Sequence, residues 1–187
     1  MKRIKDRELT DEHQTKKYEI VSLGQNCLPR TILTRWGIKP RKAQGELSCP
    51  FDLVRHKLER IIYYLEQDFK GYFDDFFFVL RKRNFLDFRG RGLWQKKDGT
   101  IFYHDKDCKI NDKEKIVQRV SGRIENFRKI LKADTPILFV LNIMNSTQEN
   151  NLEENLARLC KVIKKIRGDI YFKIAVIDFE YMVKDSD

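Results

Sequence analysis

Hydrophobic residues recur along the chain with two different spacings, and each spacing predicts a different kind of element. Short apolar runs rich in β-branched residues predict buried strands. These runs lie at residues 19–23, 137–141 and 171–177. Longer segments with an apolar residue every three or four positions predict helices with one buried side. The predicted helices cover residues 31–36, 52–66, 112–134 and 152–167.

Two further segments complete the expected order of elements. Asp98-Gly99 separates two short apolar runs, a pattern typical of a β-hairpin. The aromatic stretch 69–80 belongs to the core, although its period does not decide between helix and strand. Strands that alternate with helices favour crossover connections and parallel pairing. We therefore expect an α/β fold, with a mostly parallel sheet, helices on both faces and an inserted hairpin.

The ends of the predicted helices carry recognisable signals. Asp52 is a plausible N-cap of the second helix, with Phe51 packed beside it as a hydrophobic staple. Asn111 and Glu114 have the spacing of a capping box for the third helix. The polar side of that third helix carries three arginines, which we expect to face solvent. They are Arg119, Arg123 and Arg128.

Length and composition indicate one folded domain. The chain has 187 residues, and its thirteen phenylalanines and 41% hydrophobic content exclude a disordered chain. Residues 1–17 are charged throughout, so we expect a flexible lead-in before a single domain over 18–187. No apolar run approaches the roughly 18 residues of a membrane span, and the lead-in lacks the apolar segment of a secretory signal. These patterns predict a cytoplasmic protein with no membrane span.

Cys27 lies where a predicted strand meets a predicted helix. The strand stops at Gly24, Pro29 suits the first turn of the helix, and Gly37 suits its end. The unpaired N–H groups and the dipole of a helix start favour a thiolate and could also hold an oxyanion. Cys27 is therefore a candidate nucleophile. The alternative is a small buried hydrophobic residue at a strand–helix turn.

Polar residues follow the predicted strands at the edge where a parallel sheet binds ligands. Gln25 and Asn26 follow the first strand, Asn142 to Asn145 the second, and Asp178 the last. With the backbone N–H groups near Cys27, some of these side chains could bind substrate or an oxyanion. The full predicted set is Ser22, Gly24, Gln25, Asn26, Asp52, Asn142 and Asp178.

His104 is a candidate base, because it stands at the end of the second hairpin strand. Asp105 could orient its ring, although neighbouring residues on a strand point to opposite faces. A surface histidine without chemistry is the alternative. His13 lies in the charged lead-in and His56 on the predicted second helix, so both suit the role less well.

The cysteine spacing and the charge pattern bear on metal sites, cofactors and nucleic-acid binding. The cysteines at positions 27, 49, 108 and 160 form no CxxC pair, so we expect free thiols, no metal site and no cofactor. The net charge of +10 permits nucleic-acid binding. A basic stretch interleaved with aromatic residues, from Arg81 to Trp94, could serve for it, but no nucleic-acid-binding motif accompanies this stretch.

Four blocks of this sequence resemble an uncharacterised bacterial family described as putative papain-like cysteine peptidases. The blocks are Ile20-Val-Ser-Leu-Gly-Gln-Asn-Cys27, Pro50-Phe-Asp52, Phe102-Tyr-His-Asp105 and Arg123-Ile-Glu-Asn-Phe-Arg128. The similarity covers about residues 18–178. The family usually has tryptophan after Pro-Phe-Asp, where this chain has Leu53.

The resemblance implies roles for four residues. It makes Cys27 the nucleophile and His104 its base, with Asp105 or another acid orienting the ring, and it gives Asp52 a role beyond a cap. It also implies a papain-like α+β fold with an antiparallel sheet, which stands as the alternative to the parallel arrangement expected from the pattern.

Three functions follow from these observations. The first is a cysteine-dependent hydrolase or acyl transferase that acts on an amide or ester in a peptide, glycan or small molecule. The second is a non-enzymatic domain that binds a glycan or nucleotide in the same crevice. The third, nucleic-acid binding, rests on the basic stretch alone. The oligomeric state is left open by the sequence.

Overall fold

A computed structural model describes residues 18–80, 92–105, 107–143 and 151–178. The charged lead-in, the basic stretch 81–91 and the loop that contains Asn145 lie outside the described residues. The strands are β1 (Glu19–Ser22), β2 (Phe76–Leu80), β3 (Gly92–Lys96), β4 (Ile101–Phe102), β5 (Ile137–Ile143) and β6 (Phe172–Asp178). The α-helices are α1 (Leu28–Arg35), α2 (Leu58–Glu66), α3 (Lys113–Lys132) and α4 (Leu152–Arg167), with a 3-10 turn, η1, at Lys42–Gln44.

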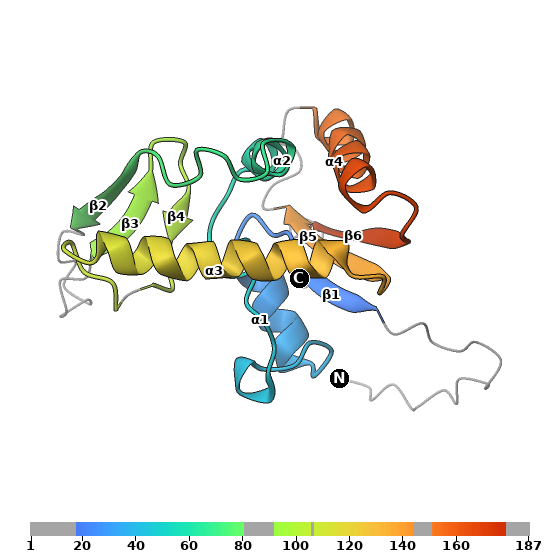
Figure 1. The fold of residues 1–187 in the computed structure, drawn as a ribbon, viewed down its shortest axis with the longest axis horizontal. Helices are drawn as coiled ribbons and strands as arrows, with labels where there is room; N and C mark the ends of the chain where they lie inside the picture. The colour runs from blue at the N-terminus through green and yellow to red at the C-terminus, as the bar shows by residue number, and fades with distance from the viewer. Residues whose placement is uncertain (1–17, 81–91, 106, 144–150, 179–187) are drawn as a thin grey trace, which may run out of the picture.

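The first of two sheets is parallel and has the strand order β1-β5-β6 (Figure 1). Its central strand β5 is buried along nearly all its length, as its unbroken apolar run predicts. Strand β6 pairs only with β5 among the described strands, and Tyr171 and Val176 beside and on it are about half exposed. The prediction of a buried last strand is therefore wrong, because a strand with one neighbour keeps an open side.

The second sheet is antiparallel, with the order β2-β3-β4. Strands β3 and β4 form the predicted hairpin. The N–H of Lys96 donates to the carbonyl of Thr100 at 3.0 Å, and Gly99 adopts the positive φ of +88° that the turn requires. The aromatic stretch supplies β2, which the pattern did not decide. Gly92 is needed opposite it, because a Cβ there would lie 2.0 Å from the ring of Phe78.

Helix α1 follows the prediction closely at both ends. It begins directly after Cys27 with Pro29 in its first turn. It ends before Gly37, whose φ of +72° belongs to the left-handed region that glycine tolerates. The β-turn-helix unit around Cys27 is thus encoded locally.

Helix α2 begins five residues later than predicted, after Lys57 rather than Asp52. Asp52 instead closes a turn, because its carboxylate accepts from the N–H of Cys49 at 2.8 Å and its own N–H donates to the Cys49 carbonyl at 3.2 Å. Phe51 is buried in the core, with its ring edge-on to Phe127 at 5.6 Å. Packing of this turn therefore takes the place of the predicted cap and staple.

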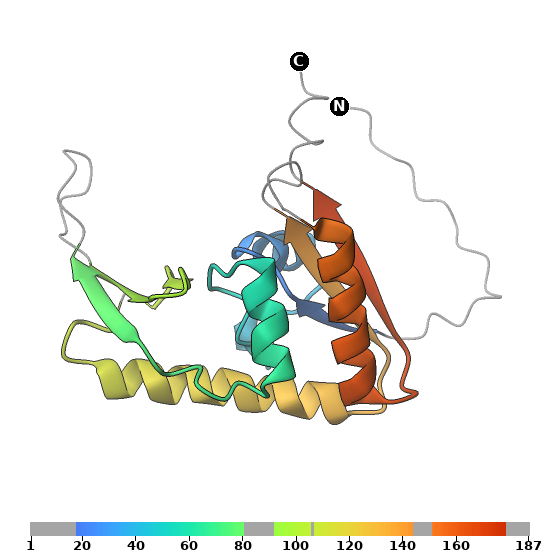
Figure 2. The ribbon, with the colours of Figure 1, turned by 90° about the horizontal axis from the view of Figure 1, so that it is seen from above.

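Helix α3 runs along both sheets, as the two views in Figures 1 and 2 show. Its apolar side joins the core, while its N-cap is Asp112 rather than the predicted Asn111. Helix α4 ends at Gly168, as predicted. The described residues form a mixed α/β structure with one parallel and one antiparallel sheet, so the prediction of a mostly parallel sheet holds for β1, β5 and β6. Helices on both faces and a single domain stay predictions.

No helix in the described ranges is long and apolar enough to cross a membrane. Within the same ranges, no group of three or more His, Cys, Asp or Glu side chains could hold a metal ion. All four cysteines have free thiols, as predicted from their spacing.

Candidate active site at the carboxyl edge of the parallel sheet

Cys27 lies at the junction of β1 and α1 and is partly exposed. Beyond β1, the N–H of Leu23 donates to the carbonyl of Val140 at 2.9 Å, and that of Gln25 to Asn142 at 3.4 Å. The Cys27 carbonyl accepts from the N–H of Thr31 at 3.0 Å and from its hydroxyl at 2.9 Å. The thiol therefore stands on a fixed backbone at the start of a helix, as the sequence predicts.

Two asparagines and a glycine hold the loop before Cys27. The Asn26 side-chain oxygen accepts from the N–H of Leu28 at 2.8 Å and from the amide of Asn142 at 3.1 Å. A Cβ on Gly24 would lie 2.3 Å from the side-chain oxygen of Asn142. Only glycine allows this close approach, so the predicted residues Gly24, Asn26 and Asn142 do come together, although 116 positions separate the last two in sequence.

The helix start offers fewer oxyanion donors than its sequence suggests. The N–H of Leu28 is taken by Asn26, and Pro29 has none. The backbone N–H of Cys27 and the side-chain amides of Gln25 and Asn26 are the candidates from the predicted set. Gln25 is buried, and both Gln25 and Asn26 also have a further polar contact of their own.

A buried charged cluster lies beside β1. Lys39 is fully buried and donates to the carbonyl of Ile20 and, at 2.5 Å, to Glu46, which also accepts from Arg30 at 3.1 Å. Burial raises the pKa of Asp52, although the charge of Lys39 opposes the shift. Asp52 therefore has a structural role: it closes the turn with Cys49 and interacts electrostatically with buried Lys39.

Ser22 and Asn142 keep unused polar atoms inside this region. Among the described residues, no hydrogen-bond partner is found for the Ser22 hydroxyl, the Asn142 side-chain oxygen or one oxygen of Asp52. Strand pairing sets Asp178 opposite Ile143, so its backbone lies at the same sheet edge as Asn142. A contact of these residues with substrate stays a prediction.

Strand β4 is linked to the Cys27 loop through residues 55 and 56. Arg55 and Ile101 exchange backbone hydrogen bonds of 2.9 and 3.1 Å, and the N–H of His56 donates to the carbonyl of Gln25 at 3.3 Å. His104 is exposed two residues beyond β4. The structure thus joins the segments that carry the two candidate catalytic residues, while the pairing of Cys27 with His104 stays a prediction.

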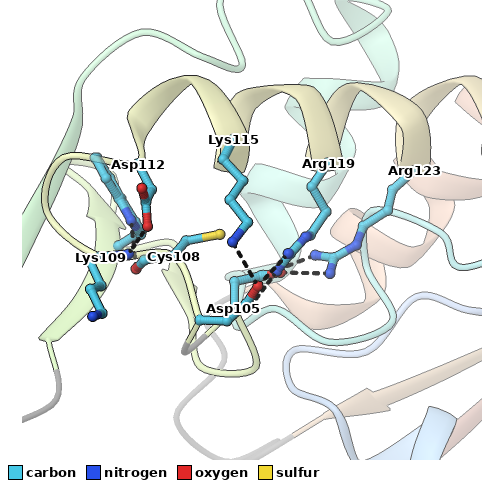
Figure 3. A network of polar contacts seen from close by, with 9 residues as sticks. Asp105, Cys108, Lys109, Asp112, Lys115, Arg119 and Arg123 are labelled. Atoms are coloured by element: carbon cyan, nitrogen blue, oxygen red, sulfur yellow. Dashed lines mark hydrogen bonds and ion pairs between the residues drawn. The ribbon is translucent and has the colours of Figure 1, made fainter.

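Asp105 is held by helix α3. It is 3% exposed, and its two oxygens accept from Arg123 at 2.8 and 3.0 Å. Arg119 adds a third contact at 3.0 Å. Figure 3 shows both arginines extending from α3 toward Asp105. These bonds make the carboxylate an anchor for the chain after β4, next to His104. The predicted role of Asp105 in orienting the His104 ring stays a prediction.

The same helix side binds Asp107, which the sequence did not single out. Arg119 donates to it through two bonds of 2.7 Å, and Lys115 lies 3.2 Å away. These bonds hold the pKa of Asp107 well below its usual range. The prediction that the arginines of α3 face solvent is wrong for Arg123, which is buried. The spacing of Lys115, Arg119 and Arg123 by four residues was the available signal.

His56 is the residue most misjudged from the sequence. It precedes α2 instead of lying on it, and it is buried with its Nε2 2.9 Å from the Tyr72 hydroxyl. Burial lowers the pKa of His56 to about 3, so the ring is neutral at ordinary pH. It supports the Gln25 carbonyl through its backbone and the aromatic core through its ring.

Trp94, at the end of the basic-aromatic stretch, is not available for base stacking. It is buried, and its Nε1 donates to the carbonyl of Cys108 at 3.2 Å. Residues 81–91 of the stretch lie outside the described part of the chain. The nucleic-acid-binding hypothesis therefore loses one of the three aromatic residues expected to stack on bases, which are Phe85, Phe88 and Trp94.

A comparison with protein families matches residues 18–181 to the family described as putative papain-like cysteine peptidase. The chain belongs to this family. The match confirms the resemblance that the four sequence blocks indicated. Searches of curated proteins and of solved structures gave no match.

Proposed function

We propose that this protein is a cysteine-dependent hydrolase or acyl transferase and that Cys27 is its nucleophile. The observation that supports the proposal is the position of the thiol. It is partly exposed at a helix start and at the carboxyl edge of a parallel sheet, whereas Cys49 and Cys108 are buried. Burial also raises the pKa of Cys49, which keeps that thiol protonated and unreactive.

The proposed reaction divides the work among a few groups. The Cys27 thiolate attacks the carbonyl carbon of an amide or ester, and His104 carries the thiol proton to the leaving group. The N–H of Cys27 and the amide of Asn26 stabilise the oxyanion. Water or a second acceptor then releases the acyl group. Asp105 acts through the backbone by holding the segment that carries His104.

The family description supports a peptide as substrate. A glycan or small molecule with an amide or ester bond would use the same chemistry. Free thiols at all four cysteines support a reducing compartment such as the cytoplasm.

Hydrolysis of a small activated ester by the full chain tests the proposal. We expect Cys27→Ala to abolish the hydrolysis and Cys160→Ala to leave it unchanged, because Cys160 is an exposed thiol on α4. Equal rates in the two variants would refute Cys27 as nucleophile. A domain that only binds ligands at this edge would then be the better interpretation.

A further inference from the structure

A second polar site lies in the antiparallel half of the protein. A cavity of about 390 Å³ opens between α2, the turn before β2 and the hairpin of β3 and β4. Tyr64, Lys96 and Asp98 line it, together with Arg60 and Asp74. None of these residues belongs to the set placed at the Cys27 edge.

Lys96 is an unusual lysine because it is only 5% exposed. Its ammonium nitrogen lies 4.5 Å from the ring centre of Tyr64 and 4.7 Å from that of Tyr72. Asp98 is the nearest carboxylate, and at 3.7 Å it is too far for a hydrogen bond. Burial lowers the pKa of Lys96, although Asp98 opposes the shift. The surroundings thus favour the neutral amine more than an exposed site would.

A chain of hydrogen bonds connects this amine to a carboxylate. Lys96 donates to the Tyr64 hydroxyl at 2.6 Å, and the Tyr64 hydroxyl donates to Asp98. The N–H of Thr100 fixes the other oxygen of Asp98 at 2.9 Å. Burial raises the pKa of Tyr64, so its hydroxyl stays protonated and can pass a proton in either direction. Amine, hydroxyl and carboxylate therefore form a relay at the cavity wall.

We propose that Lys96 is an amine nucleophile that forms an imine with a small aldehyde or ketone bound in this cavity. The nitrogen lone pair attacks the carbonyl carbon, and the carbonyl electrons move to the oxygen. One of the two amine protons moves to this oxygen, which becomes the hydroxyl group of the carbinolamine. The second amine proton passes through Tyr64 to Asp98 and returns to that hydroxyl group, while the nitrogen lone pair forms the C=N bond. That group leaves as water, so the balance is amine plus carbonyl to imine plus water.

Arg60 selects among carbonyl compounds. Its guanidinium lies at the cavity, 5.6 Å from the ring centre of Tyr63, and it can pair with a carboxylate on the ligand. A carbonyl compound with an acid group, such as glyoxylate, is therefore a suitable probe. Lys97 is the matched reference, because it follows Lys96 directly and is 77% exposed on its side chain.

The test is reductive trapping of the full chain with glyoxylate and cyanoborohydride at pH 7, followed lysine by lysine with mass spectrometry. We expect Lys96 to be labelled several-fold faster than Lys97, because its buried nitrogen is bonded to the Tyr64 hydroxyl and lies less exposed to water. Tyr64→Phe should slow Lys96 and leave Lys97 unchanged, while Tyr171→Phe, a half-exposed tyrosine beside the parallel sheet, should change neither.

Two controls keep the test decisive. In urea the two lysines should be labelled at equal rates, because the cavity is lost, and this separates the site from the intrinsic reactivity of each peptide. Lys96→Arg should remove the fast label. Labelling of native Lys96 no faster than Lys97, or a rate untouched by Tyr64→Phe, would overturn the proposal. Neither result depends on the role of Cys27.

Discussion

The edge of the parallel sheet and the polar contacts of the antiparallel half are built in different ways. At the parallel edge, the loop that carries Cys27 follows from a local pattern of strand, glycine and helix start. In the antiparallel half, three buried polar groups depend on partners 16 to 32 positions away in sequence. Asp105 pairs with Arg123, His56 with Tyr72 and Lys96 with Tyr64. A site formed by neighbouring residues can be predicted from the sequence, whereas a pair of residues distant in sequence can be identified only from the fold.

Loss of the Asp105–Arg123 pair should have the largest effect. Asp105→Ala leaves a buried guanidinium without its main partner, so we expect a loss of about 3–5 kcal/mol in the free energy of unfolding. Chemical denaturation followed by circular dichroism measures it. The double variant Asp105→Ala, Arg123→Met should lose less than Asp105→Ala alone. A larger loss of stability in the double variant would contradict the pairing of Asp105 with Arg123.

Gly24→Ala tests the parallel edge. A Cβ at this position would meet the side-chain oxygen of Asn142 at 2.3 Å and the Asn26 carbonyl at 2.6 Å. We expect a loss of about 1–3 kcal/mol in stability, as for other overpacked sites, and a loss of ester hydrolysis. Gly122→Ala on α3 is the matched control, because its Cβ would meet no atom within 4 Å. It should stabilise the helix by about 0.5–1 kcal/mol.

His56 should make stability depend on pH. Its pKa is about 3 in the folded protein and about 6.5 in the unfolded chain. Between these values the unfolded chain binds the extra proton, so stability falls as pH falls, by up to about 1.4 kcal/mol per pH unit. Urea midpoints from pH 7 to pH 4 should drop less steeply in His56→Phe than in the wild type. Parallel curves would show that His56 is not the group responsible.

Loss of the exposed carboxylate of Asp107 should have the smallest effect on stability. Asp107 is exposed and meets Arg119 and Lys115 at the surface. We expect Asp107→Ala to cost about 0.5 kcal/mol, because water already solvates both charges. Thermal unfolding in low and high salt measures this difference. A cost close to that of Asp105→Ala would mean that burial does not separate the two aspartates.

The sequence predicted most elements of the fold. The strand before Cys27, the hairpin at Asp98-Gly99 and the helix that ends at Gly168 each have strong local signals, and the structure contains all three. The start of α2 was wrong because Asp52 has the side chain of a cap but closes a turn within the core. A local signal cannot distinguish these two uses of a carboxylate.

The candidate site was predicted less completely. Gly24, Asn26 and Asn142 come together as the strand ends suggested. The arginines that hold Asp105, and the burial of His56, could not be predicted because they depend on how α3 and α2 pack against the hairpin. The choice of Cys27 over the other cysteines rests on its position at the helix start. The central claim is that this position makes Cys27 the nucleophile.

The most direct measurement of that claim is the alkylation rate of each cysteine as a function of pH, followed by mass spectrometry. A nucleophile activated by its surroundings should make Cys27 react faster than exposed Cys160 below pH 7, and His104→Ala should remove this advantage. If Cys27 reacts no faster than Cys160, or if His104→Ala changes nothing, the proposed cysteine chemistry is wrong at this site.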